Sequence, residues 1–516
     1  MLRLARAVMV LLALCCSLYS RALRSLPRHS TARRASLSIG AAGADFKEGG
    51  GSAASKRRTS SRSSDGGAAK VDYRNRNNRS GSNTGRGTYK GQKDKDDESS
   101  EPVSKEVLDA LVGPTVVLER GKARLFQDGN PLVYGGAVKM VVNGPAAGDE
   151  VRVVDHFGNL LGRGFFNPLS QYRVRMMVRA EEDKEIGLEM GALIQRRVLQ
   201  AAAVRRSVGL PSESSNVYRL VNGEGDRLGG LIIDVIGSTV VVQSSALWVE
   251  AQKVTVEKVV RAVMGKQCPK LVWKRVESRL RQDGYEGAFG DETSGGAAAG
   301  SEEVVVESGA KFVVSAEDGQ KTGFYCDQRD NRQMLRRLSA GKTVLDAYCY
   351  TGGFSVHMAL GGATKVTAVD SSQLALDTLA KNAALNGVQG VVEGHKADAL
   401  AFMQRLADEG QQFDIVVLDP PKLAPSRADL DRARGKYAKI NTLGLRLVRP
   451  GGLLLTCTCS AACTQSGEFV SIVASAARQA RRDVTVLVQA GAAPDHPVHS
   501  GYAEGRYLTA LLAAVA

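Results

Sequence analysis

Three aspartates and one cysteine in the C-terminal half of the chain each follow or end an apolar run. Asp370 ends the run KVTAVD, Asp398 comes shortly after VVEGHK, and Asp419 follows FDIVVL. Cys459 follows the run LLLTC, with Thr458 between them. Carboxylates at strand ends bind ribose hydroxyls or hold a substrate base, and a cysteine thiolate is a nucleophile. These residue types predict nucleotide chemistry in a single crevice.

The stretch from Val344 to Asp370 must position the first of these groups. Its pattern predicts an apolar strand over 343–345, a small-residue turn with Thr351, Gly352 and Gly353, an apolar helix, and a second strand that ends at Asp370. This is half of a nucleotide-binding βαβ unit, in which an acid at the end of the second strand accepts hydrogen bonds from ribose.

The turn does not contain the GxGxxG fingerprint of nicotinamide dinucleotide sites, since it reads AYCYTGG. A ligand with a ribose but no pyrophosphate fits better, and S-adenosylmethionine is the common one. A dinucleotide-dependent oxidoreductase is disfavoured by the same absence, and also by the DPPK sequence that begins at Asp419.

The alternation of strands and helices continues after Asp370 and predicts a doubly wound α/β sheet. A helix is expected over 373–385, and further strands over 391–396, 413–418, 453–457, 485–489 and 507–512. Asp370, Asp398 and Asp419 would then face one crevice at the carboxyl edge of the sheet.

The sequence Asp419-Pro420-Pro421-Lys422 predicts a rigid backbone that holds a carboxylate against a planar base. Methyltransferases that act on exocyclic amines usually have an aromatic residue after the two prolines, to stack on the target. Lys422 occupies that position here, which disfavours an amine as the target.

Cys459 offers a different reaction. Carbon 5 of cytosine becomes a good nucleophile when a thiolate adds at carbon 6, so a cysteine at a strand end could support methylation there. The alternative is that Cys459 is a small buried apolar residue. Cys457 lies on the same side of an extended strand and is the rival nucleophile, while Cys349 is expected to pack near the cofactor. No second Cys/His cluster accompanies Cys457, Cys459 and Cys463, so a metal site is not predicted.

The region before the nucleotide-binding half divides by composition. Short alternating runs over 114–180 predict a small β-barrel or sandwich, residues 184–208 a helix, and residues 217–265 strands that finish on a helix. Residues 282–301 are rich in Gly, Ala and Ser and predict a disordered loop. In KTGFYCDQRDNRQML, the residues Lys321, Gln328, Arg329 and Asn331 lie close in sequence to the nucleotide turn, although Arg329 and Arg332 could equally be solvated charges on a helix.

Charge and composition place the basic residues in an N-terminal extension. The net charge is +15, but residues 1–100 contain 20 Lys+Arg and 8 Asp+Glu, so the remaining residues are nearly balanced. The apolar run from Ala7 to Leu18 is too short to span a bilayer, and residues 1–44 contain no acid, which is typical of a targeting leader. We expect import into a plastid and no stable membrane association of the mature protein. The alternatives for this segment are a mitochondrial presequence, a plain secretory signal and a misassigned start codon. Residues 45–113 are expected to form a disordered linker, with the weaker alternative that Arg74, Arg76, Arg79 and Arg86 add RNA affinity.

The motifs KTGFYCDQRDNR, VLDAYCYTGGFSVHMALGGA, DSSQLALDTLAKNAALNG, VVLDPPKLAPS and LLLTCTCS together resemble the bacterial 23S ribosomal RNA cytosine-5 methyltransferases that carry a PUA domain. PTVVLERGKARLFQDGNPLVYGGAV and YRLVNGEGDRLGGLIIDVIG extend the resemblance to residues 114–516. It implies a PUA-like RNA-binding domain over 114–182, an α/β central domain over 183–318 and a class I methyltransferase domain, with a Rossmann-like doubly wound sheet, over 319–516. Leu132, Val133 and Tyr134 depart from the aromatic-rich turn that is usual in the PUA domain.

The resemblance also implies roles for individual residues. It assigns Asp346 and Gly352 to the methionine part of S-adenosylmethionine, Asp370 to the ribose, Asp398 to the adenine, and Gln328 and Arg329 to the border of the pocket. Tyr348 and Ser371, beside these residues in the chain, complete the predicted cofactor set. Cys459 corresponds to the nucleophile and Asp419 to the carboxylate beside the reacting methyl and the base.

The implied function is methylation of carbon 5 of a cytosine in the large-subunit ribosomal RNA of an organelle. Two alternatives remain open: a guanine-N7 ribosomal RNA methyltransferase, which needs no thiol, and a noncatalytic RNA-binding ribosome-assembly factor. Ribosomal RNA is the expected partner, and a homodimer is considered as the assembly.

Overall fold

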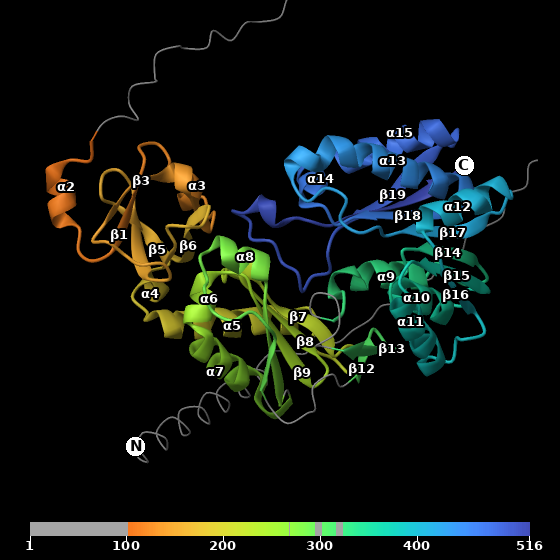
Figure 1. Ribbon diagram of the computed structural model, residues 1–516, viewed down its shortest axis with the longest axis horizontal. Helices are drawn as coiled ribbons and strands as arrows, with labels where there is room; N and C mark the ends of the chain where they lie inside the picture. Colours follow the sequence, from red (N-terminus) through yellow and green to blue (C-terminus); the bar gives the residue numbers. More distant parts are fainter. Residues whose placement is uncertain (1–101, 268, 295–301, 316–322) are drawn as a thin grey trace, which may run out of the picture. The chain divides into compact units, whose positions relative to one another are not determined.

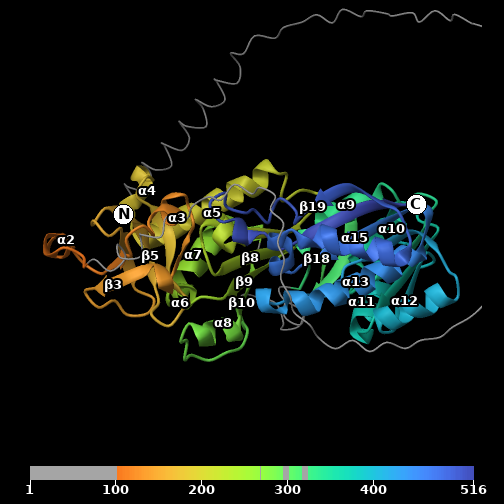
Figure 2. The same cartoon turned by 90° about the horizontal axis from the view of Figure 1, so that it is seen from above.

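A computed structural model of the protein describes residues 102–267, 269–294, 302–315 and 323–516 (Figure 1 and Figure 2). The predicted leader and most of the predicted linker lie outside the described residues, as does Lys321. All described residues belong to one unit of the chain, residues 90–516. No helix among the described residues is long and apolar enough to cross a membrane.

The alternating runs of the N-terminal part form one six-stranded sheet. Val116, Val151, Val153 and Val174 are buried between its strands and form its core with Phe166. The strands are β1 (Thr115–Leu118), β2 (Leu132–Tyr134), β3 (Val138–Val142), β4 (Glu150–Val154), β5 (Leu160–Phe166) and β6 (Tyr172–Arg179), in the order β2-β6-β5-β4-β1-β3. The short helix α3 (Arg124–Gln127) precedes β2.

The prediction of disorder up to residue 113 is wrong at its end. Residues Lys105–Ala110 form the helix α2, whose first turn is capped by the Ser104 side chain, which accepts a hydrogen bond from the Val107 amide at 3.3 Å. Val107 and Leu108 pack against buried Val117 and Val154 of the sheet. These tertiary contacts stabilise a helix that is too short to be stable alone.

A second domain is built on a five-stranded sheet in the order β11-β10-β9-β8-β7. One face of this sheet is covered by helices α5 (Met190–Ser207) and α7 (Lys253–Met264), because Leu193, Val198 and Val260 bury their side chains against Leu231 and Val242. Its strands are β7 (Val217–Asn222), β8 (Leu231–Ile236), β9 (Thr239–Ser244), β10 (Lys270–Arg275) and β11 (Glu292–Ser294). The short helices are α4 (Asp183–Ile186), α6 (Leu247–Ala251) and α8 (Glu277–Gln282).

The prediction of a disordered loop over 282–301 also needs correction. Residues 292–294 form β11, which pairs antiparallel with β10. Tyr285 and Phe289 stack edge to face with ring centroids 5.5 Å apart, and Arg281 lies 4.5 Å from the centroid of the Phe289 ring. Two aromatic rings and a strand pairing therefore order residues 282–294 despite their glycine content.

A β-hairpin connects the second domain to the third. It consists of β12 (Glu302–Glu307) and β13 (Ala310–Ser315). The Asn382 side chain accepts a hydrogen bond from the Val313 amide at 2.7 Å, and the Asn386 side chain accepts one from the Lys311 amide at 2.9 Å. The hairpin is thus fixed to helix α11 (Gln373–Leu385) of the third domain.

The third domain contains a seven-stranded sheet in the order β16-β15-β14-β17-β18-β20-β19. Strands β14 to β18 pair parallel, and β20 is antiparallel to both neighbours. Its strands are β14 (Thr343–Ala347), β15 (Lys365–Asp370), β16 (Val392–Lys396), β17 (Phe413–Leu418), β18 (Val448–Thr458), β19 (Val484–Ala490) and β20 (Thr509–Val515).

Two helical layers cover this sheet (Figure 1). Val344 and Val417 face α9 (Arg329–Arg336), α10 (Gly353–Leu360) and α11, whereas Leu345 and Val416 face the other layer. That layer contains α12 (Ala399–Asp408), α13 (Leu430–Leu447) and α15 (Glu468–Ala480), and α14 (Ala461–Ser466) follows β18. The predicted doubly wound α/β sheet is confirmed, and its topological switch lies between β14 and β17, where ligands bind in such sheets.

Candidate active site

The turn after β14 has a backbone conformation that few sequences adopt. Tyr348, Tyr350 and Gly352 have φ angles of 68°, 49° and 83°. Left-handed conformations are unfavourable for tyrosine, and such strain persists mainly where the surroundings hold it for a function. Here the Tyr350 amide donates a hydrogen bond to Asp370 Oδ2 at 3.0 Å, so the turn is tied to the end of β15.

The two glycines of the turn allow close packing. A Cβ atom on Gly352 would lie 2.0 Å from Leu379 Cδ1 of α11, and one on Gly353 would lie 2.7 Å from Arg332 Nε of α9. Side chains at these positions would push the turn away from both helices. The glycines therefore allow the turn to pack directly on α11 and α9.

Asp370 and Ser371 lie where the sequence placed them, at the end of β15. The half-buried Asp370 carboxylate accepts hydrogen bonds from the amides of Tyr350 and Ser372, the latter at 2.9 Å, and Ser371 is exposed. Each carboxylate oxygen has two acceptor sites, so one remains on each oxygen for a ribose hydroxyl. The geometry of Asp370 fits its predicted role.

Asp346, the fourth residue of β14, is fully buried. Its Oδ2 accepts a hydrogen bond from Ser355 Oγ at 2.5 Å, while its Oδ1 has no partner among the described residues. Burial, and then the nearby charge of Asp419, raises the pKa of Asp346 to about 7. A buried carboxylate oxygen without a partner fits a cationic ligand group, such as the amino group of S-adenosylmethionine.

Asp398 and Tyr348 form the side of the crevice that the sequence assigned to adenine. Asp398 is the N-cap of α12, and its Oδ1 accepts a hydrogen bond from the Ala401 amide at 2.9 Å. Burial, and then the charge of Asp398, raises the pKa of Tyr348 to about 12. The Asp398 side chain is exposed.

Asp419 is held from the side of α9. Gln328 Nε2 donates to Asp419 Oδ2 at 3.1 Å, and Asn331 Nδ2 donates to Gln328 Oε1 at 2.6 Å. Gln328 and Asn331 are 4% and 2% exposed, so this chain of hydrogen bonds is shielded from water. Gln328, which the sequence placed at the border of the pocket, orients the carboxylate that follows β17.

Arg329 and Arg332 are buried, so their interpretation as solvated helix charges is wrong. Arg329 Nη1 and Nη2 donate to Asp495 at 3.0 and 2.9 Å, and Arg329 Nε lies 3.4 Å from Asp330 Oδ1. These contacts use part of the hydrogen-bonding capacity of the guanidinium group, and the predicted contact of Arg329 with the cofactor stays a prediction. Its observed role is to join α9 to the connection between β19 and β20.

The two candidate cysteines differ in burial. β18 extends through Cys457 to Thr458, and the Cys457 side chain is 0% exposed in the core. Burial, with a contribution from the Asp419 charge, raises the pKa of the Cys457 thiol well above its ordinary value. Among the cysteines that the structure describes, only Cys459 is not buried.

The position of Cys459 is set by its neighbours. Thr458 Oγ1 and the Tyr437 hydroxyl are 2.7 Å apart, and Ser460 Oγ donates to the Ala424 carbonyl at 2.6 Å. These contacts attach the chain on both sides of Cys459 to helix α13 and to the loop that follows Asp419. The thiol is thereby held at the carboxyl edge of the sheet, between β18 and α14.

Tyr325 completes the crevice and was missed by the sequence analysis, although it lies within the motif KTGFYCDQRDNR. Its pKa is raised, first by burial and then by Tyr350, Asp327, Cys459 and Asp419, so it lies near the nucleophile and the carboxylate. Its ring is 5.4 Å from that of Tyr350, edge to face. An aromatic residue in this motif is the signal that could have identified it.

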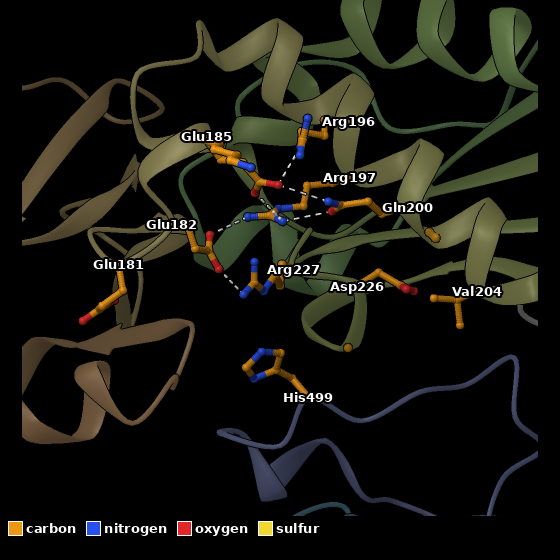
Figure 3. A pocket seen from close by; sticks show the side chains of 13 residues that line it. Glu181, Glu182, Glu185, Arg196, Arg197, Gln200, Val204, Asp226, Arg227 and His499 are labelled. Carbon is orange, nitrogen blue, oxygen red and sulfur yellow. Dashed lines mark hydrogen bonds and ion pairs between the residues drawn. The ribbon is translucent and has the colours of Figure 1, made fainter. Parts of the chain in front are cut away.

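A separate cavity of about 580 Å³ lies beside α4 and α5 (Figure 3). Its charged side chains bind one another: Glu182 pairs with Arg197 at 2.7 Å and with Arg227, and Glu185 pairs with Arg196 at 2.6 Å. None of the predicted site residues lines it. This cavity is thus distinct from the crevice at the sheet edge.

Comparisons with known proteins agree with this geometry. Residues 249–498 match the family described as S-adenosylmethionine-dependent methyltransferase, and residues 116–179 match the PUA-like domain family. The chain is 36% identical over 403 residues to ribosomal RNA large subunit methyltransferase I of Shewanella frigidimarina (strain NCIMB 400), covering 78% of this chain and 99% of that protein. The protein of the same name from Klebsiella pneumoniae (strain 342) is 35% identical over 397 residues, covering 77% and 96%.

Solved structures share the fold. A putative S-adenosylmethionine-dependent methyltransferase from Streptococcus mutans has a TM-score of 0.65 at 20% identity, covering 78% of this chain and 99% of that one. A putative methyltransferase complexed with SAH has the same TM-score at 21% identity. The predicted fold class, the PUA-like domain and S-adenosylmethionine as the cofactor are confirmed.

Proposed function

Because this chain belongs to the family of S-adenosylmethionine-dependent methyltransferases that includes ribosomal RNA large subunit methyltransferase I, we propose that it methylates carbon 5 of a cytosine in large-subunit ribosomal RNA. The PUA-like domain supports RNA as the substrate. The observation that carries the choice of carbon 5 is the accessible thiol of Cys459 at the edge of the sheet, near Asp419 and Tyr325.

Some residues of the crevice are proposed to bind the cofactor, and others to bind the target base. S-adenosylmethionine supplies an electrophilic methyl group when bound. Asp370 and Asp398 are positioned to accept hydrogen bonds from its nucleoside, and Asp346 to attract its amino group. Asp419, held by Gln328, would accept hydrogen bonds from the cytosine and fix its orientation.

The proposed reaction begins when the Cys459 thiolate forms a bond to carbon 6 of the cytosine. The electron pair displaced from the 5,6 double bond then allows carbon 5 to attack the methyl group, and the methyl–sulfur bond breaks. Water then takes the proton from carbon 5, the electrons of that carbon–hydrogen bond restore the 5,6 double bond, and the electron pair of the Cys459–carbon 6 bond returns to sulfur as that bond breaks. The base is methylated and the thiolate is regenerated.

Cys459 is better suited to this role than Cys457. A nucleophilic cysteine must reach the base as a thiolate, but Cys457 is enclosed in the core and its thiol pKa is strongly raised. Guanine-N7 methylation or a noncatalytic assembly role would leave the placement of Cys459 without a function.

We further propose that the enzyme acts in an organelle, a plastid rather than a mitochondrion. The support is the acid-free, arginine-containing leader over residues 1–44. Fluorescent fusions of the complete chain and of a chain lacking residues 1–44 test this proposal. Identical cytosolic distributions of the two would contradict it.

The decisive experiment compares Cys459→Ala with Cys463→Ala, which alters a buried cysteine of the neighbouring helix α14. Each purified variant is incubated with labelled S-adenosylmethionine and large-subunit ribosomal RNA, and bisulfite sequencing locates 5-methylcytosine. We expect Cys459→Ala to lose methylation and Cys463→Ala to retain it. RNA that contains 5-fluorocytosine should trap a covalent complex with the unaltered enzyme, because fluorine prevents the loss of a proton from carbon 5. Normal methylation by Cys459→Ala would exclude the covalent route.

A further inference from the structure

A second cavity, of about 470 Å³, adjoins the candidate active site. Its floor is the face of the five-stranded sheet opposite α5 and α7, where Ile232 of β8 pairs with Gln243 of β9. Its walls are residues 324–327, which precede α9, and residues from 496–507, in the connection between β19 and β20. This volume lies in the range of about 300–1,000 Å³ that is typical of ligand sites.

The cavity shares a wall with the reacting groups. Tyr325 lines it and also lies near Cys459 and Asp419. Tyr502 and Tyr507 also line the cavity, and the Tyr507 hydroxyl donates to Asp327 Oδ2 at 2.7 Å. Half-buried aromatic rings around a cavity are the platforms on which proteins stack unpaired bases of RNA.

The charges of the cavity are unsuited to phosphate. The carboxylates of Glu224, Asp327 and Glu504 line it. Of the described side chains in its lining, Arg219 is the only lysine or arginine, and it is bound to Asp234 through two hydrogen bonds of 2.8 and 3.0 Å. Carboxylates instead accept hydrogen bonds from the exocyclic amines of cytosine, adenine or guanine, which uracil does not have.

Gln243 adds a group that can read a base. Its side chain is half-buried on the floor and makes no hydrogen bond to another described residue. A glutamine amide has both donor and acceptor atoms and can pair with the edge of a base. The floor therefore offers a polar contact between aromatic walls.

We propose that this cavity binds one nucleobase of the RNA that neighbours the methylated nucleotide, and that it selects a base with an exocyclic amine. This inference rests on the proposed function, because the neighbouring base is defined by the reaction at Cys459. The cavity would hold the RNA strand beside the crevice and contribute to the choice of target.

The first test places a bulky side chain at Gln243, on the floor of the cavity, so that it occupies the space proposed for the base. Gln243→Trp should lower kcat/KM for a synthetic RNA centred on the methylated nucleotide by about tenfold or more, which is the loss expected when one stacked base is displaced. The affinity for S-adenosylmethionine, measured by calorimetry, should not change. The matched control is Gln411→Trp, on an exposed segment just before β17, at the amino edge of the other sheet. Gln243→Ala, which leaves the cavity open, gives a second variant if the tryptophan disturbs folding, and we expect about a threefold loss.

The second test identifies the bound base through a cycle between protein and RNA. Each nucleotide flanking the target is replaced in turn by an abasic nucleotide and by uridine, and both RNA binding and methylation are measured. At one position, both replacements should weaken RNA binding and methylation by the unaltered protein about tenfold. The same replacements should have little further effect on RNA binding and methylation by Gln243→Trp. If every flanking replacement affects both proteins equally, the cavity does not hold a base and the inference is wrong. If the unaltered protein binds these RNAs but methylates none, the proposed function fails, while the binding data still decide the inference.

Discussion

The amide of Gln328 donates a hydrogen bond to Asp419 across 3.1 Å, and this contact joins the start of α9 to the end of β17. The Gln328 oxygen in turn accepts a hydrogen bond from Asn331, which also donates to the Gly491 carbonyl at 3.3 Å. The carboxylate that we place beside the cytosine is thus oriented by a buried network rather than by its own strand alone.

Gln328→Ala should lower kcat by about 10- to 100-fold, because a hydrogen bond to a charged group contributes about 1.5–3 kcal/mol. The affinity for S-adenosylmethionine should remain close to that of the unaltered enzyme, since Gln328 orients the base-side carboxylate. Steady-state methylation and calorimetric binding measure the two quantities. The control is Gln333→Ala. The Gln333 side-chain amide donates a hydrogen bond to the Ser308 carbonyl at 3.4 Å and does not bind Asp419. Equal rates for the two variants would contradict the positioning role.

Cofactor binding should weaken as the pH falls through the pKa of Asp346, which burial raises to about 7. If the ionised carboxylate attracts the cofactor amino group, protonation below this pKa removes the attraction. The dissociation constant should therefore increase about eightfold from pH 7.5 to pH 6, as follows from the ionised fraction of one group. Asp346→Asn should bind weakly with little dependence on pH in this interval. A dissociation constant that is the same at both values for the unaltered protein would show that Asp346 does not contact a cation.

Gly352→Ala should abolish measurable cofactor binding, because the new methyl group would lie 2.0 Å from Leu379 and the φ angle of 83° is unfavourable for alanine. Gly387→Ala is the matched control, since Gly387 has a φ angle of 68° and a Cβ added there would have no atom within 4 Å. The control should show only the effect of backbone strain, about 1 kcal/mol of stability, with normal binding. Calorimetry and thermal unfolding of both variants separate these effects.

Glu307→Gln should destabilise the protein strongly. Glu307 is fully buried and binds Arg332 through two hydrogen bonds of 2.8 and 2.9 Å, with His357 Nε2 at 3.2 Å. Removing its charge leaves Arg332 buried without an anion, which typically costs about 3–5 kcal/mol. We expect the denaturant midpoint of the C-terminal domain to fall markedly. Glu302→Gln, on the same strand, should have little effect, because the ion pair of Glu302 with Lys381 is exposed.

The same contact predicts a dependence of stability on pH. Burial alone would raise the pKa of Glu307, but Arg332 and His357 reverse this effect and lower it. A carboxyl group with a lowered pKa stabilises the folded state above its unfolded pKa and loses this contribution as the pH falls through the folded value. Acid unfolding of Glu307→Gln should therefore show a weaker pH dependence below pH 4.5 than that of the unaltered protein. If the stability of Glu307→Gln and that of the unaltered protein fall equally with pH, folding does not lower the pKa of Glu307.

Local patterns located every strand of the C-terminal sheet and its carboxyl edge, although β18 begins at Val448 rather than at Leu453 and β20 spans Thr509–Val515 rather than 507–512. The predicted helix over 373–385 and strand over 413–418 have the same bounds in the structure. Apolar periodicity is a local property, and the parallel order of such strands places their ends together. Asp370, Asp398 and Asp419 could for this reason be assigned to one edge before any contact was known.

Tertiary structure alone decided which charges are buried and which thiol is accessible. Arg329 binds Asp495, 166 residues away in the chain, and no local pattern indicates that partner. Cys457 and Cys459 have the same residue type, and strand periodicity would put both on one side of an extended chain, but β18 ends at Thr458 and only Cys457 is enclosed in the core. The strand at 292–294 likewise depends on pairing with β10, because short elements with weak propensity form only when a neighbour supplies their contacts. Residue type and spacing could propose the chemistry, whereas long-range burial determined which residues are free to perform it.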